Sequence, residues 1–222
     1  MNNLSINNFG LTILVNGTSA RKEYINRSHY FLLSHGENYK LKLSNDRETK
    51  CDAEIWIDGV KIGCWRINEF DNIIVERPAK LDRKFIFLKE NSREANSAEI
   101  INGKKNNGLI KIIFKPEKKK IDFFDNSNFL YTNYSQQKLF DRVDLSQMSN
   151  SFSPPNLSHG ATALGDQSNQ LFNNTHPINN IDNANITIIM ARLMVDNNQS
   201  LKPLFSLNKA IKSTNYPNRF FD

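Results

Sequence analysis

The stretch that most constrains the fold is residues 51–77, CDAEIWIDGVKIGCWRINEFDNIIVER. Apolar and polar side chains alternate along residues 51–57, which is the period-two pattern of a strand with one face in a core. Asp58-Gly59 follows, a dipeptide suited to the positive φ angles of a two-residue hairpin turn. Apolar residues resume at Ile62 and again at residues 73–75. The stretch therefore predicts consecutive antiparallel strands joined by tight turns.

The alternation also divides the side chains of residues 51–58 between two faces. Ala53 and Ile55 are examples of the expected core face, whereas Asp52 and Glu54 fall on the outer face, where we expect the acids to be solvated. Trp56 shares that outer face and would be exposed unless something covers it. Trp56 is therefore a candidate interaction residue.

Strand-forming runs recur through the first half of the chain, separated by turn residues and closed by Lys115-Pro116, since proline cannot donate to a ladder. These runs are residues 11–15, 29–33, 39–43, 84–88 and 108–114. Seven or eight short strands in about 105 residues, with hardly any helical periodicity, are typical of an all-β fold. We predict an antiparallel β-sandwich, jelly-roll-like, with long extended C-terminal arms.

The composition changes after residue 116. We expect residues 1–116 to form the β-sandwich domain and residues 117–160 to form an extended strap dotted with aromatic residues. Residues 161–196 include a strongly apolar run at 184–195, and they are expected to return as a β-segment that completes the sheet or docks on a neighbour. Residues 197–222 are expected to form an extended tail.

Aromatic residues in the strap and tail are further interaction candidates. A linker without partners would not carry aromatic side chains at such density, so they are expected to anchor the arms on another surface. These candidates are Phe123, Phe124, Phe129, Tyr131, Tyr134, Phe140, Phe220 and Phe221.

The chain is basic, with a formal net charge of +6, and the excess lies mostly in its first half. Residues 1–116 hold nineteen Lys and Arg against fourteen Asp and Glu, whereas residues 117–222 hold ten against nine. A basic patch that could contact nucleic acid is formed in sequence by Lys104, Lys105, Lys118, Lys119 and Lys120. Acidic residues interleave the other basic clusters, so nucleic-acid binding is the alternative and not the favoured function.

We find no pattern of residues typical of a catalytic, metal or cofactor site. The four histidines lack the spacing of metal ligands, and residues 160–165, GATALG, are expected to be a loop and not a phosphate cradle. Cys51 and Cys64 flank the hairpin and could face each other across it, although reduced, buried thiols are favoured for a cytosolic product. No run approaches the roughly 18 apolar residues of a membrane span. We therefore expect a non-enzymatic protein.

A wider set of residues carries a resemblance to a known family, most specifically Trp65-Arg66-Ile67 followed by Glu76-Arg77-Pro78. The other matching segments are Val15-Asn16-Gly17, Glu23-Tyr24, Gly36 with Tyr39, Leu41 and Leu43, Ile57-Asp58-Gly59, Ile62-Gly63, Ile74-Val75, Arg83-Lys84-Phe85 with Phe87, Glu94-Ala95, Gly108-Leu109-Ile110, Phe114-Lys115-Pro116, residues 160–165, Ser168-Asn169-Gln170-Leu171-Phe172 and residues 186–193. Over about two thirds of its length the chain resembles a β-rich domain family that recurs in structural proteins of large (nucleocytoplasmic) DNA viruses and in some protists.

The resemblance implies a capsid or capsid-associated component, of a vertex (penton) or cement-like kind, that acts through oligomeric protein–protein contacts. It implies no cofactor, other capsid proteins and further copies of the chain as partners, and a place in a virion assembled in the host cytoplasm. Two alternatives remain open at this point: a basic β-domain that binds nucleic acid, and a protein-interaction module of a protist.

Overall fold

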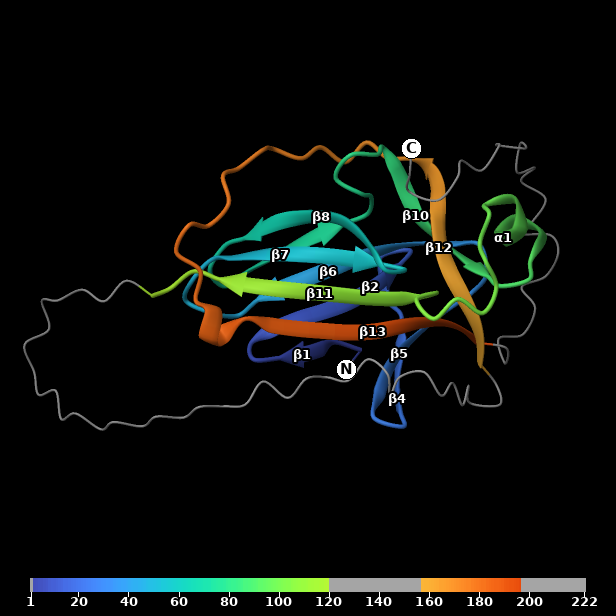
Figure 1. The fold of residues 1–222 in the computed structure, drawn as a ribbon, viewed down its shortest axis with the longest axis horizontal. Coiled ribbons are helices and arrows are strands. Elements are labelled where there is room, and N and C mark those ends of the chain that lie inside the picture. The colour runs from blue at the N-terminus through green and yellow to red at the C-terminus, as the bar shows by residue number, and fades with distance from the viewer. Residues whose placement is uncertain (1, 120–156, 197–222) are drawn as a thin grey trace, which may run out of the picture.

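The computed structural model describes residues 2–119 and 157–196, and in these residues the chain is all-β (Figure 1). The strands are β1 (Leu4–Ile6), β2 (Phe9–Val15), β3 (Thr18–Ser19), β4 (Arg21–Ile25), β5 (Ser28–Leu33), β6 (Glu37–Asn45), β7 (Cys51–Ile57), β8 (Val60–Ile67), β9 (Asp71–Val75), β10 (Arg83–Lys89), β11 (Leu109–Pro116), β12 (Leu157–Gln167) and β13 (Thr187–Asp196). One short helix, α1 (Arg93–Ser97), follows β10, and a 3-10 turn, η2 (Asn183–Asn185), precedes β13.

The strands form one continuous sheet in the order β1-β2-β6-β10-β12-β13-β11-β7-β8. Strand β9 pairs with β6, β3 with β2, and the β4–β5 hairpin joins the sheet where β5 pairs with β13. The β5–β13 pairing is parallel, and every other pairing in the described residues is antiparallel. The segment after residue 160 therefore returns to the sheet, with β12 and β13 lying between β10 and β11.

The sheet curls so that its two parts face each other across one core. Phe9 of β2 stacks on Phe114 of β11, with ring centroids 4.6 Å apart, although these two strands are not neighbours in the sheet. In Figure 1, β7 and β11 accordingly lie in front of β2 and β6. Inward residues of both parts, such as Leu41 and Ile55, are fully buried in a single apolar cluster. The alternation seen in the sequence thus fills the space between the two layers.

The hairpin predicted at residues 51–67 is confirmed. Asp58 and Gly59 have φ angles of 52° and 84°, as the two-residue turn requires. The register shows that the two cysteines are not opposite each other: Cys51 pairs with Ile67, and Cys64 pairs with Glu54. Both cysteines are free, and Cys51 is buried, as expected of reduced thiols, but Cys64 is exposed, so the expectation that both are buried is wrong for Cys64. The possibility that the two face each other across the hairpin is also wrong.

Residues 160–165, which we expected to be a loop, lie inside strand β12. The small residues allow the neighbouring strand to approach closely, which is one use of glycine in a strand. A Cβ at Gly160 would lie 2.3 Å from Phe87 Cζ, and one at Gly165 would lie 2.7 Å from Asn38 Oδ1. The glycines that made this segment resemble a loop are therefore required by its packing against β10 and β6.

Residues 168–186, here called the crossing segment, connect β12 to β13 and pass along the β8 side of the body (Figure 1). Among the described residues, β9 and β8 each pair with one other strand, so each has an open edge. Gln170 holds the segment to β9, because its side chain accepts from Glu76 N at 3.0 Å and donates to Ile74 O at 2.7 Å. Phe172 packs edge-on against Trp65, with centroids 5.5 Å apart, and beneath the Arg77 guanidinium at 4.3 Å. Trp65 and Arg77, from the most specific part of the family resemblance, thus meet at this contact.

Asp58 joins the hairpin turn to two other strands. Its buried carboxylate accepts from Gly108 N and from Thr162 N, both at 2.7 Å. Gly108 immediately precedes β11 and Thr162 lies in β12, so a single side chain fixes the relative position of three strands.

We predict that Asp58→Ala lowers the free energy of unfolding by about 3 kcal/mol, because two buried amides lose a charged acceptor and the left-handed turn loses a favourable residue. Urea denaturation of the purified chain measures the change. Asn16→Ala is the matched control, because Asn16 has a φ of 51° in an exposed turn and isolates the cost of the turn alone. Equal losses in the two variants would contradict a structural role for the carboxylate.

Candidate interaction face

The register of four strands gathers the outer side chains of β8, β7, β11 and β13 on one face. Opposed residues in neighbouring strands project from the same side of a sheet, so the pairings define rows across it. The rows are Lys61–Trp56–Lys111–Met190, Cys64–Glu54–Ile113–Ile188 and Arg66–Asp52–Lys115. We call this surface the Trp56 face.

Glu54 lies at the centre of the Trp56 face and is held by three donors. Its Oε2 is 2.8 Å from Lys61 Nζ and 2.9 Å from Lys115 Nζ, and its Oε1 accepts from Trp56 Nε1 at 2.8 Å. Burial acts to raise the pKa of this carboxyl, but the bonds from Lys61, Lys115 and Trp56 outweigh it and lower the pKa to about 2. Glu54 is therefore a fixed negative charge that links β7, β8 and β11.

Trp56 is half-buried and held in one orientation. The bond from its Nε1 to Glu54 fixes the indole, and Lys111 Nζ lies 5.9 Å from the centroid of the indole ring. We expected this side chain to be exposed unless covered, beside solvated acids. Asp52 and Glu54 are instead buried, because basic residues from β8 and β11 lie opposite them and match their charge. That expectation for the two acids is wrong.

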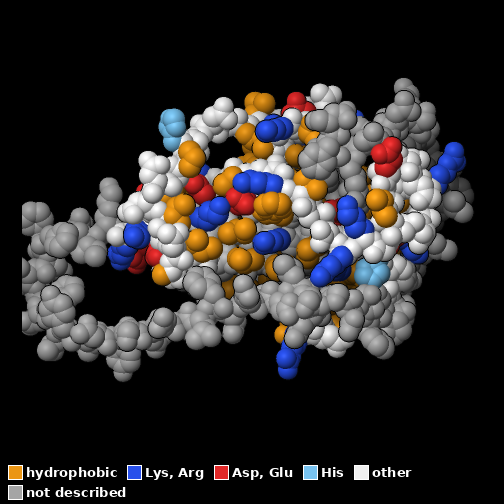
Figure 2. Space-filling model, viewed as in Figure 1, with side chains coloured by type: hydrophobic (Ala, Val, Ile, Leu, Met, Phe, Trp, Pro, Cys, Tyr) orange, Lys and Arg blue, Asp and Glu red, His pale blue; other side chains and the backbone are white. Residues whose placement is uncertain are grey.

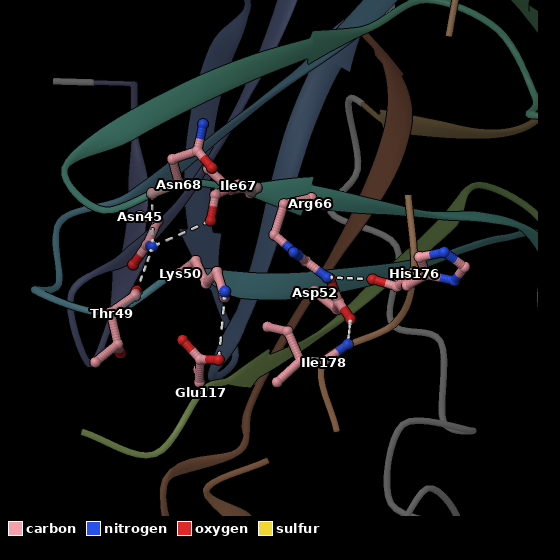
Figure 3. Close-up of polar contacts among 10 residues, drawn as sticks. All are labelled: Asn45, Thr49, Lys50, Asp52, Arg66, Ile67, Asn68, Glu117, His176 and Ile178. Carbon is pink, nitrogen blue, oxygen red and sulfur yellow. Dashed lines mark hydrogen bonds and ion pairs between the residues drawn. The ribbon is translucent and has the colours of Figure 1, made fainter. Parts of the chain in front are cut away.

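The edge of the Trp56 face is formed by contacts between Asp52, Arg66 and the crossing segment (Figure 3). Arg66 Nε donates to Asp52 Oδ1 at 2.6 Å, and Arg66 Nη2 donates to His176 O at 2.8 Å. The second carboxylate oxygen of Asp52 accepts from Ile178 N at 2.9 Å. The Asp52 carboxylate thus accepts hydrogen bonds from β8 and from the crossing segment, and it fixes the position of that segment beside β7.

The Trp56 face shows a partner mostly positive charge and apolar surface. The acids are largely buried, with Glu54 and Asp52 side chains 11% and 10% exposed, whereas the Lys61 side chain is 48% exposed. Ile188 is also 48% exposed. Figure 2 shows apolar side chains on this side of the molecule, interspersed with lysines and arginines. Four basic residues against two buried acids leave the face net positive.

Neither cysteine supplies a thiolate at neutral pH. Burial, followed by the charge of Asp52, raises the pKa of Cys51 to about 12. Cys64 is an exposed residue, but partial desolvation of its thiol, followed by the charge of Asp52, also raises its pKa. In residues 2–119 and 157–196, no group of three or more His, Cys, Asp or Glu side chains is placed to hold a metal ion. No helix among those residues is long and apolar enough to cross a membrane.

The basic residues selected from the sequence do not form a single patch. Lys104 and Lys105 are exposed in the loop before β11, and Lys118 and Lys119 follow its end. An eight-residue strand separates the two pairs, a span of roughly 25 Å. Lys119 is also paired with Glu48. The two pairs of lysines are close in sequence because both adjoin β11, but β11 is extended and places them at its opposite ends.

Several candidates from the sequence lie outside the described residues. These are Lys120, Phe123, Phe124, Phe129, Tyr131, Tyr134, Phe140, Phe220 and Phe221. Of the aromatic candidates, Trp56 is the one that the structure places. The sequence analysis missed its neighbours Lys61, Lys111 and Lys115, although alternation in each strand assigns them to the outer side once the pairing of β7, β8 and β11 is known.

Comparisons of the chain with protein-family models, with curated proteins and with solved structures find no match.

We predict that Glu54→Gln changes the acid dependence of stability. A carboxyl whose pKa falls from 4.5 to about 2 on folding stabilises the protein fully above pH 4.5. That contribution, on the order of 1–3 kcal/mol after solvent screening, is lost as the pH falls from 4.5 towards 2. Urea unfolding between pH 2 and pH 7 should show a shallower loss in the variant.

Glu69→Gln serves as the control for this measurement, because Glu69 is an exposed acid in the β8–β9 connection. The control should keep the acid dependence of the wild-type protein. Identical pH profiles for Glu54→Gln and wild type would show that the three donors do not stabilise the Glu54 carboxylate.

Proposed function

We propose that the chain is a non-enzymatic structural protein, a capsid or capsid-associated (vertex or cement-like) component of a large DNA virus. In this proposal the body is a jelly-roll-like antiparallel sandwich with long extended C-terminal arms, and the protein acts within the virion. The Trp56 face contacts an acidic and apolar surface of a neighbouring capsid protein. The observation that carries the proposal is that the Trp56 face combines apolar area with side chains already fixed in place.

Fixed side chains favour protein binding because little conformational entropy remains to be lost on association. Trp56 is held by Glu54 and Lys111, and Lys61 and Lys115 are held by the same Glu54 carboxylate. A partly buried Trp surrounded by basic and apolar side chains has the composition of an interface centre. The same ion pairs make Glu54 a poor proton donor or acceptor at neutral pH, because its pKa is about 2.

The charge on the Trp56 face also limits how two copies of the chain can meet. A two-fold contact that buried this face against itself would oppose Lys61, Lys111 and Lys115 to their own copies. A contact with a different, acidic surface avoids that repulsion. Homo-oligomers formed through the Trp56 face are therefore head-to-tail, an arrangement that closes into a ring when the rotation between copies permits.

The capsid part of the proposal is supported by the family resemblance and by the place of its residues in the fold. Trp65, Arg77 and Phe172 all belong to matching segments and meet where the crossing segment is held to the body. Residues matched for structural reasons are expected to hold the same fold in relatives. The partner, the virion location and the arms are inferred from the resemblance.

Nucleic-acid binding is the competing function. A surface for single strands usually offers several aromatic side chains on which successive bases stack. In the three rows of the Trp56 face, Trp56 is the aromatic residue, and its indole already has Lys111 beside it. The composition of the face therefore favours a protein partner.

We predict that Lys111→Glu and Trp56→Ala in the full-length protein each weaken its association with its own copies or with capsid proteins by at least tenfold, about 1.4 kcal/mol or more. Sedimentation velocity measures association of the chain with its own copies. Co-sedimentation with proteins from disassembled virus particles measures association with capsid proteins. Lys42→Glu is the matched control, since Lys42 is a half-buried strand lysine of β6, paired with Thr12 and Ile74 in the other layer.

The outcomes of this experiment separate the functions. Absence of the chain from purified particles would overturn the virion assignment. Association that is equally strong in Lys111→Glu and in wild type would exclude the Trp56 face as the contact. Salt-sensitive binding of single-stranded DNA or RNA that is lost in Lys111→Glu, without protein association, would establish nucleic-acid binding in place of the proposed function.

A further inference from the structure

A groove of about 400 Å³ lies where β11 ends, beyond the Arg66–Asp52–Lys115 row of the Trp56 face. Its walls come from the β6–β7 turn, the β8–β9 turn, the end of β11 and the segment around η2. The groove is lined by the basic residue Arg47, by the apolar residues Phe70 and Pro116, and by the acids Asp46 and Asp182.

Asn45 ties two of these walls together. This fully buried residue donates from Nδ2 to Thr49 O and to Asn68 O, both at 2.8 Å (Figure 3). Thr49 belongs to the β6–β7 turn and Asn68 begins the β8–β9 turn. Lys50 and Glu117, 3.3 Å apart, join the β6–β7 turn to the end of β11. The groove is therefore held open by bonds in its walls and does not depend on a ligand for its shape.

Arg47 brings a guanidinium to this groove without a full set of partners. Its Nη1 is buried and has no hydrogen-bond acceptor among the described residues, and no ion pair of Arg47 occurs there either. The guanidinium carbon lies 5.3 Å from the centroid of the Phe9 ring, so the group rests on the apolar core. Nη1 itself is out of reach of a ligand, but Arg47 as a whole is half-buried and lines the groove, so a ligand there meets the exposed part of this side chain and can supply a charge partner.

Phe70 is the second unusual residue of the groove. It has a φ of 51° and is 70% exposed, and its backbone N donates to Arg47 O at 3.2 Å. A bulky residue in the left-handed region costs on the order of 1–2 kcal/mol, and at this exposure the ring recovers little of that cost through burial. An exposed aromatic ring and a cationic side chain that line the same groove are instead suited to contact a ligand that is both apolar and anionic.

The surrounding charges select against a simple anion. Glu48 and Glu117 are paired with Lys119 and Lys50, whereas Asp46 and Asp182, which also line the groove, have no ion pair among the described residues. A free anion would be attracted by the Arg47 guanidinium but repelled by Asp46 and Asp182. A peptide can place one carboxylate on Arg47, an aromatic ring on Phe70 and a basic side chain near Asp46 or Asp182, and it therefore matches the charges better.

We propose that this groove binds an extended peptide segment in which an aromatic residue directly precedes an aspartate or glutamate, with the carboxylate on Arg47 and the ring against Phe70. The site shares no residue with the three rows of the Trp56 face, so it does not rest on the proposed function. It can exist whether or not the chain is a capsid protein.

The test uses calorimetric titration of the full-length protein with the capped peptide acetyl-Asn-Arg-Phe-Phe-Asp-amide. This is the sequence of residues 218–222, and it combines an aromatic pair, a following carboxylate and a basic residue. Because the chain itself carries this sequence, the titration is repeated on the full-length Phe221→Ala/Asp222→Asn variant. Equal binding to both proteins, or binding only to the variant because the chain's own residues compete, supports the proposal.

Two protein variants and one peptide control locate the contacts. Arg47→Met removes the charged group that lies over Phe9 and puts an apolar side chain in its place, and it should weaken binding at least tenfold. Phe70→Asn tolerates the left-handed backbone and should weaken binding as well. The peptide ending in asparagine in place of aspartate should bind at least tenfold more weakly to the unchanged protein.

Three results would overturn the proposal: no binding to either full-length protein at about 1 mM peptide, unchanged affinity in Arg47→Met, or equal affinity for the two peptides. Competition by acetate at a concentration equal to that of the peptide would assign the groove to small anions instead. Thermal unfolding of each variant, measured in parallel, shows whether the protein used in the titration is folded.

Discussion

Three carboxylates on β7 and its turn must be matched before this body can close, because a carboxylate taken out of water is costly unless donors replace the water. Asp52 is matched by Arg66 and by the backbone of the crossing segment, and Glu54 by Lys61, Lys115 and Trp56. Asp58 is matched by amides at the start of β11 and in β12. Each acid therefore connects β7 to elements distant in sequence, and one strand coordinates much of the molecule.

The position of β13 depends on the same connections. β13 pairs with β11 over six residues, and β11 pairs with β7 over seven, so the register fixed at β7 is passed across the sheet. A slip of one residue would turn Lys111 and Lys115 into the core and would bring Ile112 to the surface. The Trp56 face and the apolar core are consequently two results of one register, and neither can shift alone.

The sequence was most informative where a local pattern decides the structure. Alternation and Asp58-Gly59 predicted the β7–β8 hairpin, and the apolar run near 184–195 predicted β13. It failed where the deciding partner is distant. Glycines of β12 are required by Phe87 and Asn38, and Asp52 is buried because Ile178 and Arg66 reach it. The composition of a single segment cannot predict the packing of these glycines or the burial of Asp52. Both depend on which distant strands pair.

The Trp56 face and the groove at Arg47 differ in whether their charged side chains already have partners within the protein. On the Trp56 face both acids already have basic partners and the side chains around Glu54 are held in place, so a partner gains apolar contact and the remaining positive charge and loses little order. At the groove, Arg47 has no ion pair among the described residues and Phe70 is exposed, so a partner adds a charge pair and apolar contact that the free protein lacks. A compensated surface tolerates many partners of the right shape and charge. A cationic side chain without an ion pair is more selective, because it favours a ligand that brings an acceptor to that position.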